Sequence, residues 1–290
     1  MGEMIESAST VHLATVENAG KQGYGIWLKP EAPPEWANYR SFDRWAKHMW
    51  RFNSQPGGIR VWDAGSGSGT RFKTLRSFID PIFKITIVAT DLQEDALTRF
   101  PKAIETTKNP RDSVFTIQAD ITKPPPFSLP VTGISCLSVF PWLDIEGSKQ
   151  ALTHFYSQLE EDGALILELC TPYNQVALFA EGTTQDDLEI EFRIKKMLTH
   201  FAETNNKEPL TIFNQKYNKN VVVHTQKCAT NLLTEAGFTN ITCTNQHNMY
   251  FPNGIHATLE ERFAIQPSWN ARHEFRSHEN LLLFATKEPK

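Results

Sequence analysis

Short apolar runs alternate with amphipathic runs from residue 59 onward, and this alternation predicts an α/β protein. The apolar runs that are expected to form strands cover residues 59–64, 85–90, 114–119, 133–140 and 164–169. The intervening stretches carry apolar residues at helical spacing, as over residues 94–107 and 143–159. Strands and helices that alternate at this interval predict a parallel, doubly wound sheet with helices on both faces.

The pattern changes after residue 171, and this change predicts an insertion. A polar, charged helix is expected over residues 186–203, with a loop after it, and we interpret residues 172–222 as a cap inserted after the fifth strand. A helix over residues 225–236 and strands over residues 239–244 and 281–286 then complete the sheet. The connection between those last two strands is long, and connections of this length are often functional.

The residues before the first strand are rich in aromatic side chains. After a Pro-Pro pair, apolar residues recur at every third or fourth position, which predicts a helix over residues 35–52. These residues are Trp36, Tyr39, Phe42, Trp45, Met49 and Phe52. We interpret residues 1–56 as an N-terminal arm with an aromatic helical lid and residues 57–290 as the main domain. Tyr24 and Trp27 are candidates for closing over a substrate, and packing against the aromatic helix is the alternative for both.

The composition is that of a globular protein without a strong charge. Hydrophobic residues make up 40% of the 290 residues and charged residues 21%, which favours a packed core over disorder. A net charge of −4 argues against a protein that binds nucleic acid through its phosphates. No apolar run approaches the roughly 20 residues that span a bilayer, so no membrane partner is expected.

The cysteines and the N-terminus bear on compartment and metal binding. The four cysteines show no Cys-x-x-Cys spacing, and Cys136 and Cys170 lie within apolar runs, as reduced core cysteines do. The first residues have neither a basic start nor an apolar signal core. We therefore expect a cytoplasmic protein with no metal site.

A carboxylate and three glycines stand where the first strand should turn into the first helix, in the segment Val61-Trp62-Asp63-Ala64-Gly65-Ser66-Gly67-Ser68-Gly69. Glycine permits a tight turn and the close approach of a ligand, and the carboxyl edge of an open α/β sheet is the usual ligand site. The nicotinamide fingerprint requires a glycine where this chain has Thr70. Asp91 also lies later than the usual interval of about 20 residues for a ribose carboxylate. Dinucleotide binding is therefore disfavoured.

The segment from Asp63 to Gly69 resembles the first motif of the class I S-adenosylmethionine-dependent methyltransferases, here of the small-molecule type. Further elements of that family are matched in the expected order along residues 59–287. They are an acid ending the second strand (Asp91), an acid closing the third (Asp120), a turn after the fourth (Leu137 to Phe140) and the Ala236-Gly237-Phe238 turn before the sixth. The resemblance implies a Rossmann-like, seven-stranded sheet and S-adenosylmethionine as the cofactor.

The resemblance also assigns roles to single residues at this edge of the sheet. Asp91 should accept hydrogen bonds from the ribose hydroxyls, and Asp120 should accept one from the adenine amine. The adenine ring should contact Leu92 and the amide of Ile121, whereas the methionine ammonium should meet the carbonyls of Gly65 and Ser138 and the carboxylate of Asp63. Ser66, Gly67 and Gly69 complete the turn. The alternative for each carboxylate taken alone is a helix N-cap.

The implied reaction is methyl transfer to nitrogen or oxygen of a small, largely apolar metabolite, roofed by the lid and the cap. A hydroxyl nucleophile needs a general base, most often histidine, and His247 after the sixth strand is the candidate. Trp142 after the fourth strand is a candidate substrate contact, with a core aromatic as the alternative. Two other functions stay open: a relative that binds the cofactor without transferring its methyl group, and a protein methyltransferase.

Overall fold

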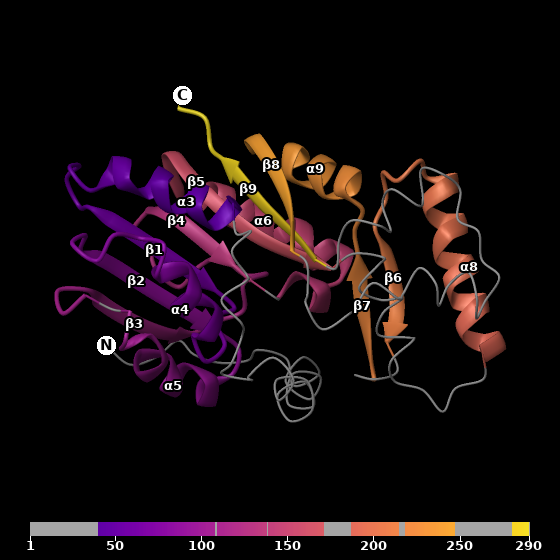
Figure 1. The fold of residues 1–290 in the computed structure, drawn as a ribbon, viewed down its shortest axis with the longest axis horizontal. Helices are drawn as coiled ribbons and strands as arrows, with labels where there is room; N and C mark the ends of the chain where they lie inside the picture. Colours follow the sequence, from indigo (N-terminus) through magenta and orange to yellow (C-terminus); the bar gives the residue numbers. More distant parts are fainter. Residues whose placement is uncertain are drawn as a thin grey trace.

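The computed structural model describes residues 40–107, 109–137, 139–170, 187–214, 218–246 and 280–289. A mixed sheet of seven strands in the order β3-β2-β1-β4-β5-β9-β8 forms its centre (Figure 1). The strands are β1 (Ile59–Ala64), β2 (Ile85–Asp91), β3 (Ser113–Gln118), β4 (Val131–Cys136), β5 (Leu159–Cys170), β8 (Thr239–Gln246) and β9 (Asn280–Thr286). Neighbours among β1 to β5 pair in parallel, whereas β9 lies antiparallel between β5 and β8. The predicted seven-stranded sheet is confirmed.

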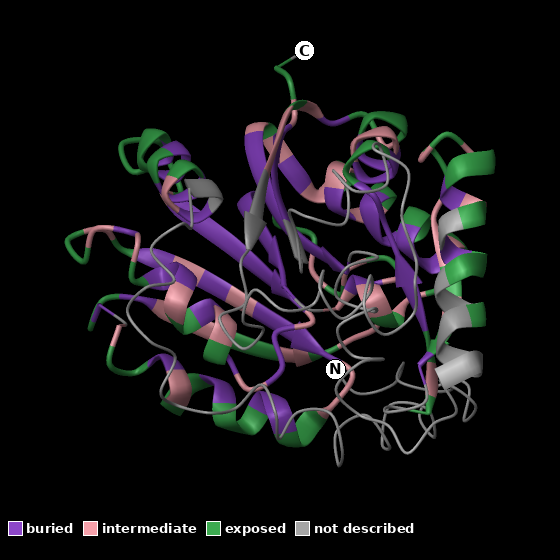
Figure 2. Ribbon diagram, turned by 45° about the vertical axis from the view of Figure 1, so that its right-hand side comes forward, coloured by how far each residue is buried: buried purple, intermediate pink, exposed green. Residues whose placement is uncertain are grey.

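Helices cover both faces of the sheet, so its central strands are buried along their length (Figure 2). One face carries α3 (Arg40–Met49), the 3-10 turn η1 (Trp50–Phe52), α4 (Thr70–Arg76) and α5 (Glu94–Ile104). The other carries α6 (Ile145–Gln158) and α9 (Gln226–Glu235). Because both faces are covered there, β1 and β4 are buried at every position, which explains the nearly continuous apolar runs of the central strands, whereas β3 at the edge is half-buried to exposed.

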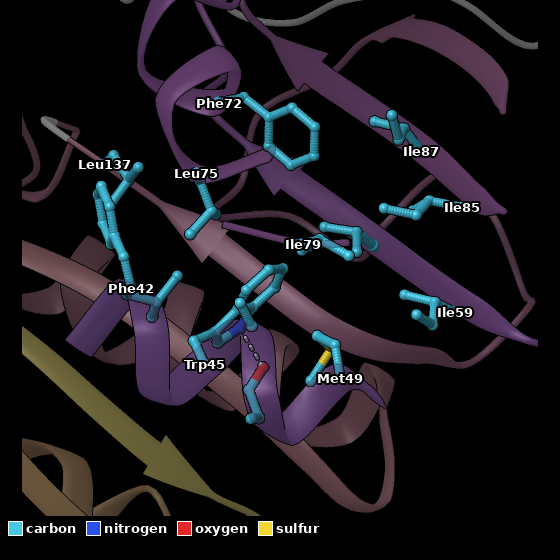
Figure 3. Packing of buried hydrophobic residues seen from close by; sticks show 14 of the residues in the cluster. Phe42, Trp45, Met49, Ile59, Phe72, Leu75, Ile79, Ile85, Ile87 and Leu137 are labelled. Atoms are coloured by element: carbon cyan, nitrogen blue, oxygen red, sulfur yellow. Dashed lines mark hydrogen bonds between the residues drawn. The ribbon is translucent and has the colours of Figure 1, made fainter. Parts of the chain in front are cut away.

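Helix α3 belongs to the hydrophobic core and corrects part of the lid prediction. Phe42, Trp45 and Met49 are buried on the side of α3 that faces the sheet (Figure 3). The indole of Trp45 donates a hydrogen bond to the carbonyl of Ala164 on β5 at 3.2 Å. A Cβ at Gly133 on β4 would lie 2.7 Å from Trp45 and 2.6 Å from the sulfur of Met49.

This packing on a sheet face means that residues 40–52 are a core element and not a lid, so that part of the prediction is wrong. An apolar helical stripe shows that a helix must bury one face, but not which surface it will cover. The remainder of the predicted lid, with Tyr24 and Trp27, lies outside the described residues.

The fourth strand is shorter than the sequence pattern predicts. It ends at Cys136, and the 3-10 turn η2 (Phe140–Trp142) follows, whereas the apolar run predicts a strand to residue 140. Pro141 lies within η2, one residue beyond the predicted end of the strand. The chain therefore turns away at the carboxyl edge.

The insertion after β5 contains a helix and a small sheet. The predicted helix is confirmed as α8 (Asp187–Glu203), but the predicted loop after it is a β-hairpin of β6 (Leu210–Asn214) and β7 (Lys219–Val223). The hairpin lies between α8 and the large sheet (Figure 1), and β7 packs against η2. After β7, the backbone N–H of His224 donates to the carbonyl of Cys170 at 2.8 Å. The insertion thus adjoins the carboxyl edge of the sheet.

Candidate functional site

The glycine turn between β1 and α4 has a backbone that only glycine adopts without strain. Gly65 has φ +69° and Gly69 has φ +85°, both in the left-handed region. The space for a side chain is also filled, because a Cβ at Gly65 would lie 2.3 Å from Val139 and one at Gly69 would lie 2.8 Å from Phe100. The N–H of Ser66 donates to the carbonyl of Thr90 on β2 at 2.8 Å. These contacts fix the turn against the loop after β4 and against β2.

Asp91 at the end of β2 holds the turn with its side chain. Its Oδ2 accepts a hydrogen bond from the N–H of Gly67 at 2.8 Å, and its Oδ1 accepts one from the N–H of Gln93 at 2.9 Å. Burial raises the pKa of Asp91, and these two hydrogen bonds partly counteract the effect. A carboxylate offers about four lone-pair positions, so Asp91 can accept ribose hydroxyls in addition.

Asp63 is a buried carboxylate with one oxygen unsatisfied. Its Oδ1 accepts a hydrogen bond from the hydroxyl of Ser135 on β4 at 2.6 Å, and its Oδ2 has no hydrogen-bond partner in the described part of the chain. The pKa of Asp63 is raised from 3.8 to about 7. Burial is the largest cause, the hydrogen bond from Ser135 partly counteracts it, and the nearby Asp91 carboxylate adds to the rise. An unpaired buried carboxylate oxygen is costly, and a cationic ligand would satisfy it.

The end of β3 joins the same edge. The N–H of Ala119 donates to the carbonyl of Asp91 at 3.0 Å, which places Asp120 beside the end of β2. Asp120 is half-buried, and its Oδ1 accepts hydrogen bonds from both the N–H and the hydroxyl of Thr122. Ile121 is buried and Leu92 half-buried. The residues predicted for the adenine therefore lie on adjacent loops after β2 and β3.

The helix N-cap alternative is wrong for these carboxylates. Gly69 is the N-cap of α4 and Gln93 is the N-cap of α5, and neither makes a side-chain cap hydrogen bond. Asp120 precedes a turn and not a helix. Asp91 and Asp120 each accept a hydrogen bond from the backbone N–H two residues ahead, so each shapes the loop that follows its strand.

A buried ion pair at the same edge was not predicted from the sequence. Glu168 on β5 has only 2% of its side chain exposed, and its Oε1 lies 3.2 Å from Nη2 of Arg71 in the first turn of α4. Burial raises the pKa of the Cys136 thiol, and the carboxylates of Asp63 and Glu168 raise it further. Asp63 pairs with Ser135 on β4, and Glu168 follows the residue of β5 that pairs with Cys136, so the two carboxylates lie on the strands either side of the end of β4. The sequence does contain an indication of this ion pair, because Glu168 stands inside the apolar run Leu165 to Leu169. Such runs form buried strands, and a buried charged residue is almost always paired.

The residues predicted for substrate binding and catalysis are only partly described. Trp142 in η2 has 37% of its surface exposed, and Nζ of Lys219 on β7 lies 5.9 Å from the centroid of its ring. Ser138 and His247 lie outside the described residues. Within the residues that the structure describes, no group of three or more His, Cys, Asp or Glu could hold a metal ion. Nor does that part of the chain contain a helix with the length and apolarity to span a membrane.

Comparison with known proteins supports the fold. No family model matches the sequence, and no curated protein matches it either. Magnesium protoporphyrin IX methyltransferase from Synechocystis PCC 6803, solved with bound S-adenosylhomocysteine, is similar in structure. It has a TM-score of 0.52 and 12% sequence identity, and the match covers 95% of this chain and 100% of that one.

A second similar structure is 1,6-didemethyltoxoflavin N1-methyltransferase from Burkholderia thailandensis, solved with 1,6-didemethyltoxoflavin and S-adenosylhomocysteine. It has a TM-score of 0.53 and 11% identity, and the match covers 99% of this chain and 94% of that one. The chain therefore has the fold of the class I S-adenosylmethionine-dependent methyltransferases, as the sequence resemblance predicted.

Proposed function

We propose that the protein is an S-adenosylmethionine-dependent methyltransferase that acts on nitrogen or oxygen of a small, largely apolar metabolite. The observation that carries the proposal is the unsatisfied Oδ2 of Asp63, buried beside a glycine turn that Asp91 holds in place. The cofactor has an ammonium and a sulfonium at one end and a ribose with two hydroxyls in its middle. The residues present fit such a ligand, because Asp63 provides an anionic oxygen and Asp91 provides hydrogen-bond acceptors.

In this proposal, residues at three strand ends bind three different parts of the cofactor. Asp63 near the end of β1 would bind the ammonium together with the carbonyl of Gly65. Asp91 at the end of β2 would bind the ribose, and Asp120 after β3 would bind the adenine amine. Each charge-assisted hydrogen bond would contribute about 1.5–3 kcal/mol in a site shielded from water. Ser138 is proposed as a further carbonyl toward the ammonium.

The bound cofactor would supply a methyl group on a positively charged sulfur, which an incoming nucleophile can take. The chain's own residues would bind the two reactants in line and exclude water, since proximity and alignment provide most of the acceleration in such a displacement. The partly exposed face of Trp142, beside β7 of the insertion, is the proposed contact for an apolar substrate. Two similar structures are named for methylating small molecules, which supports this substrate class. For a hydroxyl nucleophile, His247 remains the proposed base.

The test separates cofactor binding from methyl transfer. Titration calorimetry with S-adenosylhomocysteine should show binding by the purified chain. Incubation with methyl-labelled S-adenosylmethionine and a small-molecule extract should then label a low-molecular-mass product. The Asp95→Asn variant, altered at an exposed carboxylate in the first turn of α5, is the matched control and should do both. Binding without label transfer to any fraction would favour a relative that does not transfer methyl, and absence of binding would refute the proposal.

A further inference from the structure

Lys219, the first residue of β7, turns its charged end toward a tryptophan at the carboxyl edge of the large sheet. Its Nζ lies 5.9 Å from the centroid of the Trp142 ring, which is the distance of a cation–π contact. Trp142 lies in η2, which comes shortly after the carboxyl end of β4, and β7 packs against η2. The contact therefore joins the insertion to the edge of the sheet that carries the candidate site.

The ammonium of Lys219 has no negatively charged partner among the described residues. No ion pair in that part of the chain includes it, and the ring of Trp142 carries no net charge. The side chain is half-buried, and burial lowers the pKa of its ammonium. Removing a charge from water is costly unless the charge is paired. An anionic ligand would supply the partner that the described residues do not.

We propose that Lys219 binds a carboxylate of the methyl-accepting substrate and that Trp142 packs against the apolar part of the same molecule. This inference rests on the proposed function, and it narrows the substrate class from an apolar metabolite to an apolar carboxylic acid. Trp142 is 37% exposed and offers an apolar surface, and the ammonium beside it has three N–H donors. One ammonium balances the single charge of a carboxylate, whereas a phosphate monoester carries about two negative charges.

The competing explanation is that the stem of Lys219 only packs against Trp142 and keeps its ammonium in water. Lysine side chains often cover an apolar surface in this manner. In that case the Lys219→Met substitution would preserve the packing and would affect charged and neutral ligands alike. A carboxylate receptor would affect only the charged ligand. The ratio of two affinities therefore separates the two explanations.

The experiment compares 2-naphthoate with its neutral amide, 2-naphthamide, by titration calorimetry on protein saturated with S-adenosylhomocysteine. The two probes share one ring system and differ in charge. Wild-type protein should bind 2-naphthoate with a dissociation constant on the order of 1 mM and 2-naphthamide about tenfold more weakly, as a charge-assisted hydrogen bond would provide. In the Lys219→Met variant the two affinities should come within about threefold of each other. The Lys219→Arg variant keeps the charge and should retain the preference for 2-naphthoate.

Two further variants define the reading of this ratio. Lys227→Met removes an exposed cation on α9 and should leave the wild-type ratio unchanged. Trp142→Leu should weaken both probes by the same factor, because both carry the ring system.

Three outcomes would overturn the assignment. They are a preference for 2-naphthoate that persists in Lys219→Met, binding of neither probe by wild-type protein, and tighter binding of 2-naphthyl phosphate than of 2-naphthoate. Each of these outcomes would leave the proposed function intact. Wild-type protein that does not bind S-adenosylhomocysteine would overturn the proposed function and this assignment with it.

Discussion

Replacement of Asp63 by asparagine should change the stability of the ligand-free protein in a pH-dependent manner. Asp63 is buried, and the only hydrogen bond of its carboxyl group in the described part of the chain comes from the hydroxyl of Ser135. Burial and the neighbouring Asp91 carboxylate raise its pKa to about 7. Asparagine has the same shape, cannot ionise and can still accept the hydrogen bond from Ser135. The substitution therefore removes the charge and leaves the packing.

The sign and the size of this effect on the free energy of unfolding follow from the difference between the pKa of Asp63 in the folded protein and its pKa in the unfolded chain. Because the folded pKa of about 7 lies above the unfolded value of 3.8, folding favours the protonated form of Asp63. Its stabilising contribution is complete below the unfolded pKa and is lost as the pH rises through the folded pKa. The stabilising contribution that is lost over the whole pH range is about 4 kcal/mol, and about 2.5 kcal/mol of it is lost between pH 5 and pH 8.

The stability of the Asp63→Asn variant relative to wild type should therefore rise by about 2.5 kcal/mol from pH 5 to pH 8. At pH 5 the variant should be less stable by about 1–3 kcal/mol, because its amide N–H groups have no acceptor. Urea unfolding of ligand-free protein at several pH values measures the difference. Asp95→Asn, at an exposed position, is the control and should show the pH dependence of wild type. A constant difference between Asp63→Asn and wild type from pH 5 to pH 8 would refute the reasoning.

Three further outcomes are expected. Asp91→Asn should weaken binding of S-adenosylhomocysteine at least about tenfold in calorimetry, because an amide turns an N–H group toward the ribose hydroxyls or the N–H of Gly67; unchanged affinity would contradict the ribose assignment. NAD should not raise the melting temperature, whereas S-adenosylhomocysteine should, and equal stabilisation would contradict the cofactor assignment. Trp45→Phe should lower the free energy of unfolding by about 2 kcal/mol, because the carbonyl of Ala164 loses the indole donor; a change below about 0.5 kcal/mol would argue against α3 as a core helix.

The order and type of the elements could be predicted from the sequence because burial leaves a periodic pattern. The central parallel strands β1 and β4 are covered on both faces, and their apolar runs identify them without any tertiary information. Trp62 is buried against Phe127 and Phe155 on the face of β1 away from Asp63, as the alternation of side chains along a strand requires. The surface that an amphipathic helix will cover is not contained in its own pattern. For this reason α3 was predicted as a helix but assigned to a lid.

The site was predictable where its residues share a short segment or a strand end. Asp63, Asp91 and Asp120 stand at or just after the carboxyl ends of β1, β2 and β3, and parallel strands bring these ends to one edge. The pairing of Arg71 with Glu168 joins positions far apart in the sequence, and neither stands in a recognisable spacing. The sequence likewise gives no sign of the unsatisfied oxygen of Asp63, because the absence of a partner among the described residues follows only from the positions of its neighbours.

The same charges explain why this glycine turn should select a cation over a dinucleotide. In nicotinamide-binding folds the turn offers backbone N–H groups to a pyrophosphate. Here the N–H of Gly67 is already donated to the carboxylate of Asp91 at 2.8 Å, so an anion of the protein itself takes that donor. When it is ionised, Asp63 adds a second negative charge near Asp91, which would repel a pyrophosphate and attract an ammonium and a sulfonium. The buried charge that lowers the stability of the empty fold above neutral pH is thus the charge that a cationic cofactor would neutralise.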